Sequence, residues 1–225
     1  HHQPRRQRQM CIRDSISGGN GDDVLSGGAD NDSLTGGAGT DTFKVDVGTD
    51  TITDLGGASG GETDVLIVSA GATANATNIT SFTADSSTSN SGTANLTTKV
   101  GGGTIDIGNS TTGAYSLTGL SGNDTLKGNG NADIINGGGG DDNIDGRGGN
   151  DEINGGAGDD IITVSSAGQG DGDTIDGGSG TDTLSLSSGS HAFATDAKLQ
   201  NINSITLAST STVIDLTGQT ESLTI

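Results

Sequence analysis

The sequence predicts an all-β fold, a parallel β-solenoid, on the strength of three observations. A nine-residue unit recurs along residues 18–53 and 119–185, glycine makes up 42 of the 225 residues, and proline occurs once. Each unit ends in a short x-aliphatic-x segment, which suits a strand with one inward side chain. Repetition at a fixed short period is typical of solenoids, in which each turn packs only against its neighbours.

The repeated unit reads Gly-Gly-x-Gly-x-Asp-x-U-x, where U is a large apolar residue. Clear copies are GGAGTDTFK at residues 36–44, GGGGDDNID at 137–145 and GGAGDDIIT at 155–163. The glycines allow positive φ and a tight turn, which points several carbonyl oxygens at one place. The Asp adds a carboxylate, and carboxylate and carbonyl oxygens are the ligands that Ca²⁺ prefers. We therefore expect several calcium ions, bound by Asp23, Asp32, Asp41, Asp50, Asp124, Asp133, Asp142, Asp151, Asp160, Asp173 and Asp182.

The U positions are the expected core. They are Leu25, Leu34, Phe43 and Ile52 in the first array, and Leu126, Ile135, Ile144, Ile153, Ile162, Ile175 and Leu184 in the second. Three places depart from the pattern. Asp30 stands where a fourth glycine belongs, residues 128–136 (GNGNADIIN) lack the second and fourth glycines, and Val164–Ala167 are inserted between repeats.

This pattern resembles the RTX, or hemolysin-type, calcium-binding nonapeptide repeat. The resemblance implies a right-handed parallel β-roll, in which consecutive repeats lie on alternate edges and each calcium sits between turns two repeats apart. It implies aspartate pairs such as Asp124 with Asp142, Asp133 with Asp151, and Asp142 with Asp160. It also implies ligand carbonyls from the first and third turn residues: Gly18, Asn20, Gly36, Ala38, Gly137, Gly139, Gly155, Ala157, Gly177 and Ser179.

These aspartates have two other interpretations. They could cap their own turns by accepting hydrogen bonds from nearby backbone. Residues 141–152 also fit the formula of an EF-hand loop, but an EF-hand needs a helix on each side and both flanks are glycine-rich repeats.

Changes of pattern along the chain predict five segments. Residues 16–55 form a first array, 56–116 a β-rich spacer, 117–185 a second array, and 186–225 a solenoid-like extension that is expected to be truncated. The spacer reads as a hairpin, as irregular solenoid turns, or as linker. Residues 1–15 hold four of the nine basic residues, and residues 5–15 resemble a translated sequencing adapter, so we expect an artefact there.

Composition excludes several classes of function. The formal charge is −20, so no basic footprint for nucleic acid exists, and no apolar run is long enough for a transmembrane helix. No catalytic or cofactor-binding constellation is found, and His191 is expected to be an exposed substitution for Asp. We therefore expect no enzyme within this stretch.

The RTX resemblance implies calcium-induced folding outside the cell and suggests the type I secretion apparatus as a partner. We expect a structural module of a secreted adhesin or cell-surface protein, whose surface ligand the sequence does not identify. The alternative is the C-terminal module of a secreted hydrolase, such as a serralysin-like protease or lipase, or of an RTX toxin.

Overall fold

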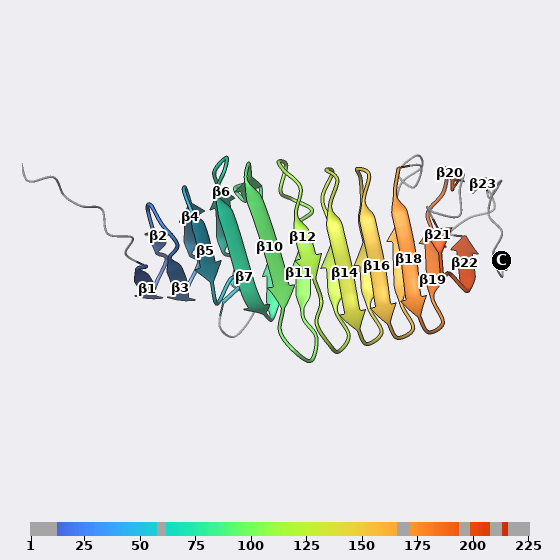
Figure 1. The fold of residues 1–225 in the computed structure, drawn as a ribbon, viewed down its shortest axis with the longest axis horizontal. Helices are drawn as coiled ribbons and strands as arrows, with labels where there is room; N and C mark the ends of the chain where they lie inside the picture. Colours follow the sequence, from blue (N-terminus) through green and yellow to red (C-terminus); the bar gives the residue numbers. More distant parts are fainter. Residues whose placement is uncertain (1–12, 58–61, 166–171, 194–198, 208–212, 216–225) are drawn as a thin grey trace, which may run out of the picture.

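The computed structural model describes residues 13–57, 62–165, 172–193, 199–207 and 213–215. The chain winds as a stack of coils along one long axis, with the N-terminal and C-terminal coils at opposite ends (Figure 1). Every strand pair in these ranges is parallel, and none of these residues is helical. The predicted all-β parallel roll is confirmed, and the helices that an EF-hand needs are missing from both sides of residues 141–152.

One sheet runs along nearly the whole stack. It contains β1 (Ser15–Asn20), β3 (Ser33–Ala38), β5 (Thr49–Ile52), β7 (Thr73–Ile79), β10 (Thr93–Thr98), β12 (Ser116–Thr118), β14 (Ile134–Gly139), β16 (Glu152–Ala157), β18 (Thr174–Ser179) and β21 (Leu199–Gln200).

The other strands of each coil form three shorter sheets. The first contains β2 (Val24–Ser26), β4 (Thr42–Val45), β6 (Val65–Val68) and β9 (Ser89–Asn90). The second contains β8 (Ser81–Thr83), β11 (Thr104–Asp106), β13 (Thr125–Lys127), β15 (Asn143–Asp145), β17 (Ile161–Val164), β19 (Thr183–Leu186) and β22 (Ser204–Leu207). The third pairs β20 (Ser190–Ala192) with β23 (Val213–Asp215).

The register shows that one coil is two nonapeptides long. Leu34 pairs with Ile52, and Ile135 pairs with Ile153, each 18 residues further on. Since each nonapeptide supplies one turn and one short strand, successive nonapeptides lie on opposite edges, and every second strand meets its equivalent in parallel. The predicted alternation of edges is therefore observed.

The core consists of ladders of the U side chains. All eleven predicted U residues are at most 2% exposed. Leu126, Ile144, Ile162 and Leu184 follow one another in register along one ladder. The strands are short and each contributes one or two inward side chains, so adjacent coils bury each other's apolar surface and no coil has a core of its own.

The predicted spacer continues the same sheet. Ile52 of β5 pairs with Ala76 of β7, and Leu96 of β10 pairs with Leu117 of β12, all in parallel. Irregular solenoid turns therefore account for the described part of residues 56–116, because a hairpin would pair its strands antiparallel. The division into five segments remains a prediction. Residues 1–12, Ser166, Ala167 and residues 216–225, on which other expectations fell, lie outside the described residues.

Candidate calcium sites

The sixth-position aspartates form columns on the two edges of the roll. Each lies two residues ahead of an inward apolar side chain, where the turn ends and the strand begins. Asp23 is half-buried, whereas the other ten predicted ligands are at most 4% exposed. In the second array, one edge carries Asp124, Asp142, Asp160 and Asp182, and the other carries Asp133, Asp151 and Asp173.

In ten of the eleven aspartates, all but Asp23, Oδ1 accepts a backbone hydrogen bond from a described residue of the preceding coil. Oδ1 of Asp142 accepts a hydrogen bond from the backbone N–H of Asp124 at 2.8 Å, and Oδ1 of Asp160 accepts one from Asp142 at 2.8 Å. Asp151 accepts from Asp133 in the same way, also at 2.8 Å. These bonds bring together the three aspartate pairs that the resemblance implied.

The second oxygen of most of these carboxylates is buried without any hydrogen-bond partner. This holds for Oδ2 of Asp23, Asp32, Asp50, Asp124, Asp142, Asp151, Asp160 and Asp182. A buried polar atom without a partner costs about 1–3 kcal/mol, and more when it carries charge. Turn capping does not explain these Oδ2 atoms, because the oxygens of a capping carboxylate would accept hydrogen bonds from the backbone N–H groups of its own turn. A row of unpartnered anionic oxygens is what a bound cation would stabilise.

The turn glycines keep a space open beside these oxygens. A Cβ atom added to Gly137 would collide with Oδ2 of Asp142 and with the carbonyl oxygen of Gly155 from the next coil. Gly155 is placed in the same way between Asp160 and the carbonyl of Gly177. A carboxylate oxygen and a carbonyl oxygen of the next coil converge in this way on five first-position glycines: Gly18, Gly119, Gly128, Gly137 and Gly155. This donor set fits Ca²⁺, which is a hard cation with a preference for oxygen.

Seven of the ten predicted carbonyls fall into two groups. First-position carbonyls of Gly36, Gly137, Gly155 and Gly177 lie against the first glycine of the preceding coil on the same edge. Third-position carbonyls of Ala38, Ala157 and Ser179 accept backbone bonds from Gly21, Gly140 and Gly158, at 2.7, 2.7 and 2.9 Å. The remaining three lie within strands: Gly18 and Asn20 in β1, and Gly139 at the end of β14.

Burial and crowding raise the pKa of these carboxyls. Burial is the main cause for Asp142, whose pKa rises to about 6, with neighbouring Asp160 and Asp124 adding to the effect. Burial likewise raises the pKa of Asp151 to about 8, helped by Asp173 and Asp133. Without a cation, the folded roll therefore binds protons in its aspartate columns at a pH where the unfolded chain would release them.

A second ladder, which the sequence did not suggest, runs through the fifth position of the repeat. The side chain of Asp141 accepts from the backbone N–H of Asp159 at 2.9 Å, and Asp159 accepts from Thr181 at 2.8 Å. Asn123 accepts from Asp141 at 3.0 Å. These bonds run from the later coil to the earlier one, opposite to those of the sixth position. A turn with both kinds of bond is thus hydrogen-bonded to the coil before it and to the coil after it. The Asn or Asp that directly precedes the sixth-position Asp is the sequence feature that indicates this second ladder.

Three further residues join the columns outside the nonapeptide pattern. Asp64 accepts from Asp41 at 2.8 Å, Asn203 accepts from Asp182 at 2.6 Å, and Asp54 accepts from both Gly36 and Gly37. Asp64 and Asn203 each stand two residues before an inward aliphatic side chain, as the repeat aspartates do. That spacing would have identified both from the sequence, without the glycines.

The expectation that His191 is exposed is wrong, although it does stand two residues before the inward Phe193, as the repeat aspartates stand before their inward residues. His191 is 1% exposed, and its Nε2 lies 3.1 Å from the carbonyl oxygen of Ser187. It faces inward from β20 because it has the same parity along the strand as the buried Phe193. It is a core residue at this point of the extension.

Within the described ranges, no three His, Cys, Asp or Glu side chains gather as a metal-binding group. The same ranges include no helix with the length and hydropathy needed to cross a membrane.

Comparison with known proteins identifies the repeat. A family model described as the RTX calcium-binding nonapeptide repeat matches in four copies, at residues 17–52, 111–144, 137–166 and 167–190. These matches cover just over half of the 225 residues. No curated protein matches the chain.

Proposed function

The chain belongs to the RTX calcium-binding nonapeptide repeat family, whose repeats form calcium-binding β-rolls, and from this premise we propose that calcium drives its folding outside the cell. The observation that carries the proposal is the row of buried Oδ2 atoms without partners. A fold that contains them is costly in the absence of a cation and is stabilised when one binds, because binding to the folded state alone adds to its stability.

The proposed ligands are the sixth-position aspartates whose Oδ2 lacks a partner, together with the carbonyls that converge on the same glycines. Asp142 with the Gly155 carbonyl, and Asp160 with the Gly177 carbonyl, are the clearest pairs. Bound calcium would supply positive charge between carboxylates of adjacent coils. The protein's part is to hold those oxygens at a fixed spacing, through the Oδ1 bonds of one ladder and the fifth-position bonds of the other.

We further propose that this roll is a structural spacer in a secreted adhesin or cell-surface protein. The continuous sheet from β1 to β21 supports it, because a long stack of coils separates its two ends without needing a globular core. Cytosolic calcium is low, so the chain would remain unfolded before export, which suits passage through a type I secretion apparatus. Nothing in the roll itself requires a catalytic role.

The test is a calcium titration of the full chain, followed by far-UV circular dichroism. We expect a coil-like spectrum in chelator and a cooperative gain of β signal at roughly 10⁻⁴–10⁻³ M calcium, the range of extracellular modules. Magnesium at the same concentrations should have little effect, because it holds its water shell and demands near-octahedral geometry. A β spectrum already complete in chelator and unchanged by calcium would refute the coupling.

A further inference from the structure

The repeat at residues 128–136 differs from its neighbours in how its aspartate is bonded. Oδ1 of Asp133 accepts from the backbone N–H of Tyr115 at 2.7 Å, and Oδ2 accepts from the N–H of Asn129 at 2.8 Å. Both oxygens are therefore occupied by the protein. Asp142 and Asp151, in the turns that follow, keep an unpartnered Oδ2.

In this repeat an asparagine stands in place of the second-position glycine, and its backbone N–H is the donor to Oδ2 of Asp133. Asn129 stands at the second position and is 1% exposed. Its Nδ2 donates to the carbonyl of Gly113 at 3.0 Å, and its Oδ1 accepts from the N–H of Asn131 at 2.8 Å. The side chain of Asn129 thus ties its turn to the preceding coil with neutral hydrogen bonds.

The preceding coil offers no carboxylate at the matching position. Tyr115 stands there, and its hydroxyl lies 2.8 Å from Oγ of Ser110, which in turn lies 3.1 Å from the carbonyl oxygen of Thr88. Tyr115 is 2% exposed. The interval between Tyr115 and Asp133 therefore has one carboxylate, and both of its oxygens accept hydrogen bonds. The next interval on this edge, between Asp133 and Asp151, has two carboxylates.

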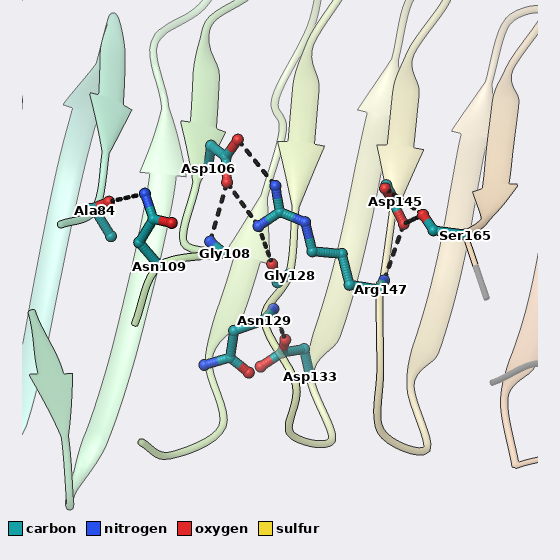
Figure 2. A network of polar contacts seen from close by, with 10 residues as sticks. All are labelled: Ala84, Asp106, Gly108, Asn109, Gly128, Asn129, Asp133, Asp145, Arg147 and Ser165. Carbon is teal, nitrogen blue, oxygen red and sulfur yellow. Dashed lines mark hydrogen bonds and ion pairs between the residues drawn. The ribbon is translucent and has the colours of Figure 1, made fainter. Parts of the chain in front are cut away.

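A cation from the chain itself is placed beside this interval. Arg147 stands at the second position of the next repeat on this edge, with φ of 67°. Its guanidinium reaches back across two coils to Asp106, with N–O distances of 2.8 and 3.2 Å, and Nη1 donates to the carbonyl of Gly128 at 3.0 Å (Figure 2). A side chain at Gly108 would collide with the guanidinium, so this glycine leaves room for it.

We propose that Asp133, Asn129 and Arg147 form a metal-free cap that ends the calcium column on this edge. The inference rests on the proposed function, since it states which repeat does not take part in it. Arg147 supplies the positive charge here through a bidentate pair with Asp106, a geometry that guanidinium favours. The Gly128 carbonyl and both Asp133 oxygens already accept hydrogen bonds from the protein, and Tyr115 stands in place of a second carboxylate, so we expect this interval to bind no calcium.

The decisive experiment compares Asp133→Asn with Asp142→Asn in the full chain. Both variants keep an oxygen to accept the bond from the neighbouring coil. Bound calcium is counted by native mass spectrometry, and affinity is measured by calorimetry. We expect Asp133→Asn to bind as many ions as the unmodified chain, with affinity changed less than twofold. We expect Asp142→Asn to lose at least one ion.

The outcomes separate this proposal from the one before it. Loss of an ion in both variants would overturn the cap and leave calcium binding by the columns intact. No loss in either variant would overturn the assignment of the column ligands. Loss of an ion from Asp142→Asn, with none lost from Asp133→Asn, supports both proposals.

The role of Arg147 is tested separately, at saturating calcium. Arg147→Gln should lower the melting temperature by several degrees while the number of bound ions stays the same. Lys127→Gln, which removes one positive charge from the adjacent strand β13, is the matched control and should melt close to the unmodified chain. In a double-mutant cycle with Asp106→Asn, the two losses should not add. Additive losses, or equal melting of both single-charge variants, would overturn the assignment.

Discussion

Replacing Asp142 by Asn should have opposite effects with and without calcium. The amide keeps an oxygen for the bond from Asp124, as Asn203 does for Asp182 in the same column. It removes a charge from a side chain that is 2% exposed and lies close to the carboxylates of Asp124 and Asp160. It also removes the unpartnered Oδ2, which is the proposed calcium ligand.

The size of the effect follows from the raised pKa. A rise of the Asp142 pKa from 3.8 to about 6 corresponds to an upper limit of about 3 kcal/mol for the cost of ionisation, at about 1.4 kcal/mol per pH unit. Because water screens part of this cost, we expect a gain of about 1–2 kcal/mol for the metal-free fold at pH 7.5. In saturating calcium the sign should reverse, since a ligand is lost.

The assay is folding induced by an excluded osmolyte in chelator, followed by circular dichroism, because such osmolytes favour burial without binding the site. The Asp142→Asn variant should fold at a lower osmolyte concentration than the unmodified chain, and should need more calcium when titrated with the metal. Asp141→Asn is the matched control, since Asp141 is exposed and its bond from Asp159 also survives the change. If Asp142→Asn were less stable than the unmodified chain in chelator, the reasoning would be refuted.

Three further predictions concern pH, backbone strain and the core. In chelator, β content should fall as pH rises from 5 to 8. The pKa of Asp142 is about 6 and that of Asp151 about 8 in the fold, so the folded state holds protons that the unfolded state has released. Circular dichroism measured against pH tests this, and a rise in β content would contradict it. Asp30→Gly should stabilise the calcium-bound form by about 1 kcal/mol, since Asp30 has φ of 84° in a region that suits glycine; a lower melting temperature would count against it. Ile153→Ala should lower the free energy of unfolding by about 2–5 kcal/mol, because Ile153 is 2% exposed in the ladder and truncation there leaves a cavity. Chemical denaturation in calcium measures this loss. A loss below about 1 kcal/mol would contradict the prediction and show that the ladder collapses around the gap.

The sequence was most informative where one residue type serves one geometric need. The nine-residue spacing of aspartates and aliphatic residues predicted the edges, the ladders and the buried U positions, because a two-nonapeptide coil stacks in only one register. The partners of each carboxylate could not be predicted in this way. Asp133 and Asp142 occupy the same position in their repeats, and only the folded chain shows that Asn129 and Tyr115 satisfy the first of them.

Residues outside the pattern were missed for a related reason. The glycines before Asp64 (GGASGG, residues 56–61) are out of the nonapeptide register, yet its Oδ1 accepts from Asp41 and its Oδ2 accepts from Gly56 and Gly57. Arg147 contacts Asp106, which lies 41 residues earlier in the chain, and nothing in the local sequence signals this contact. Such contacts depend on how coils of unequal length come into register, and a nonapeptide count does not contain that information.

The bonding of the carboxylates divides the roll into parts with different needs. Both carboxylate oxygens of Asp54 and of Asp64 accept hydrogen bonds from backbone N–H groups near the end of the first array. Both oxygens of Asp133 do so near the start of the second array. Among the described residues between Asp64 and Asp124, no aspartate has a buried oxygen without a partner. The coils there pack through the same sheet as the arrays but carry no uncompensated charge. The dependence of local stability on calcium should therefore be strongest in the two arrays and weakest in the coils between them, which hydrogen exchange at subsaturating calcium can resolve segment by segment.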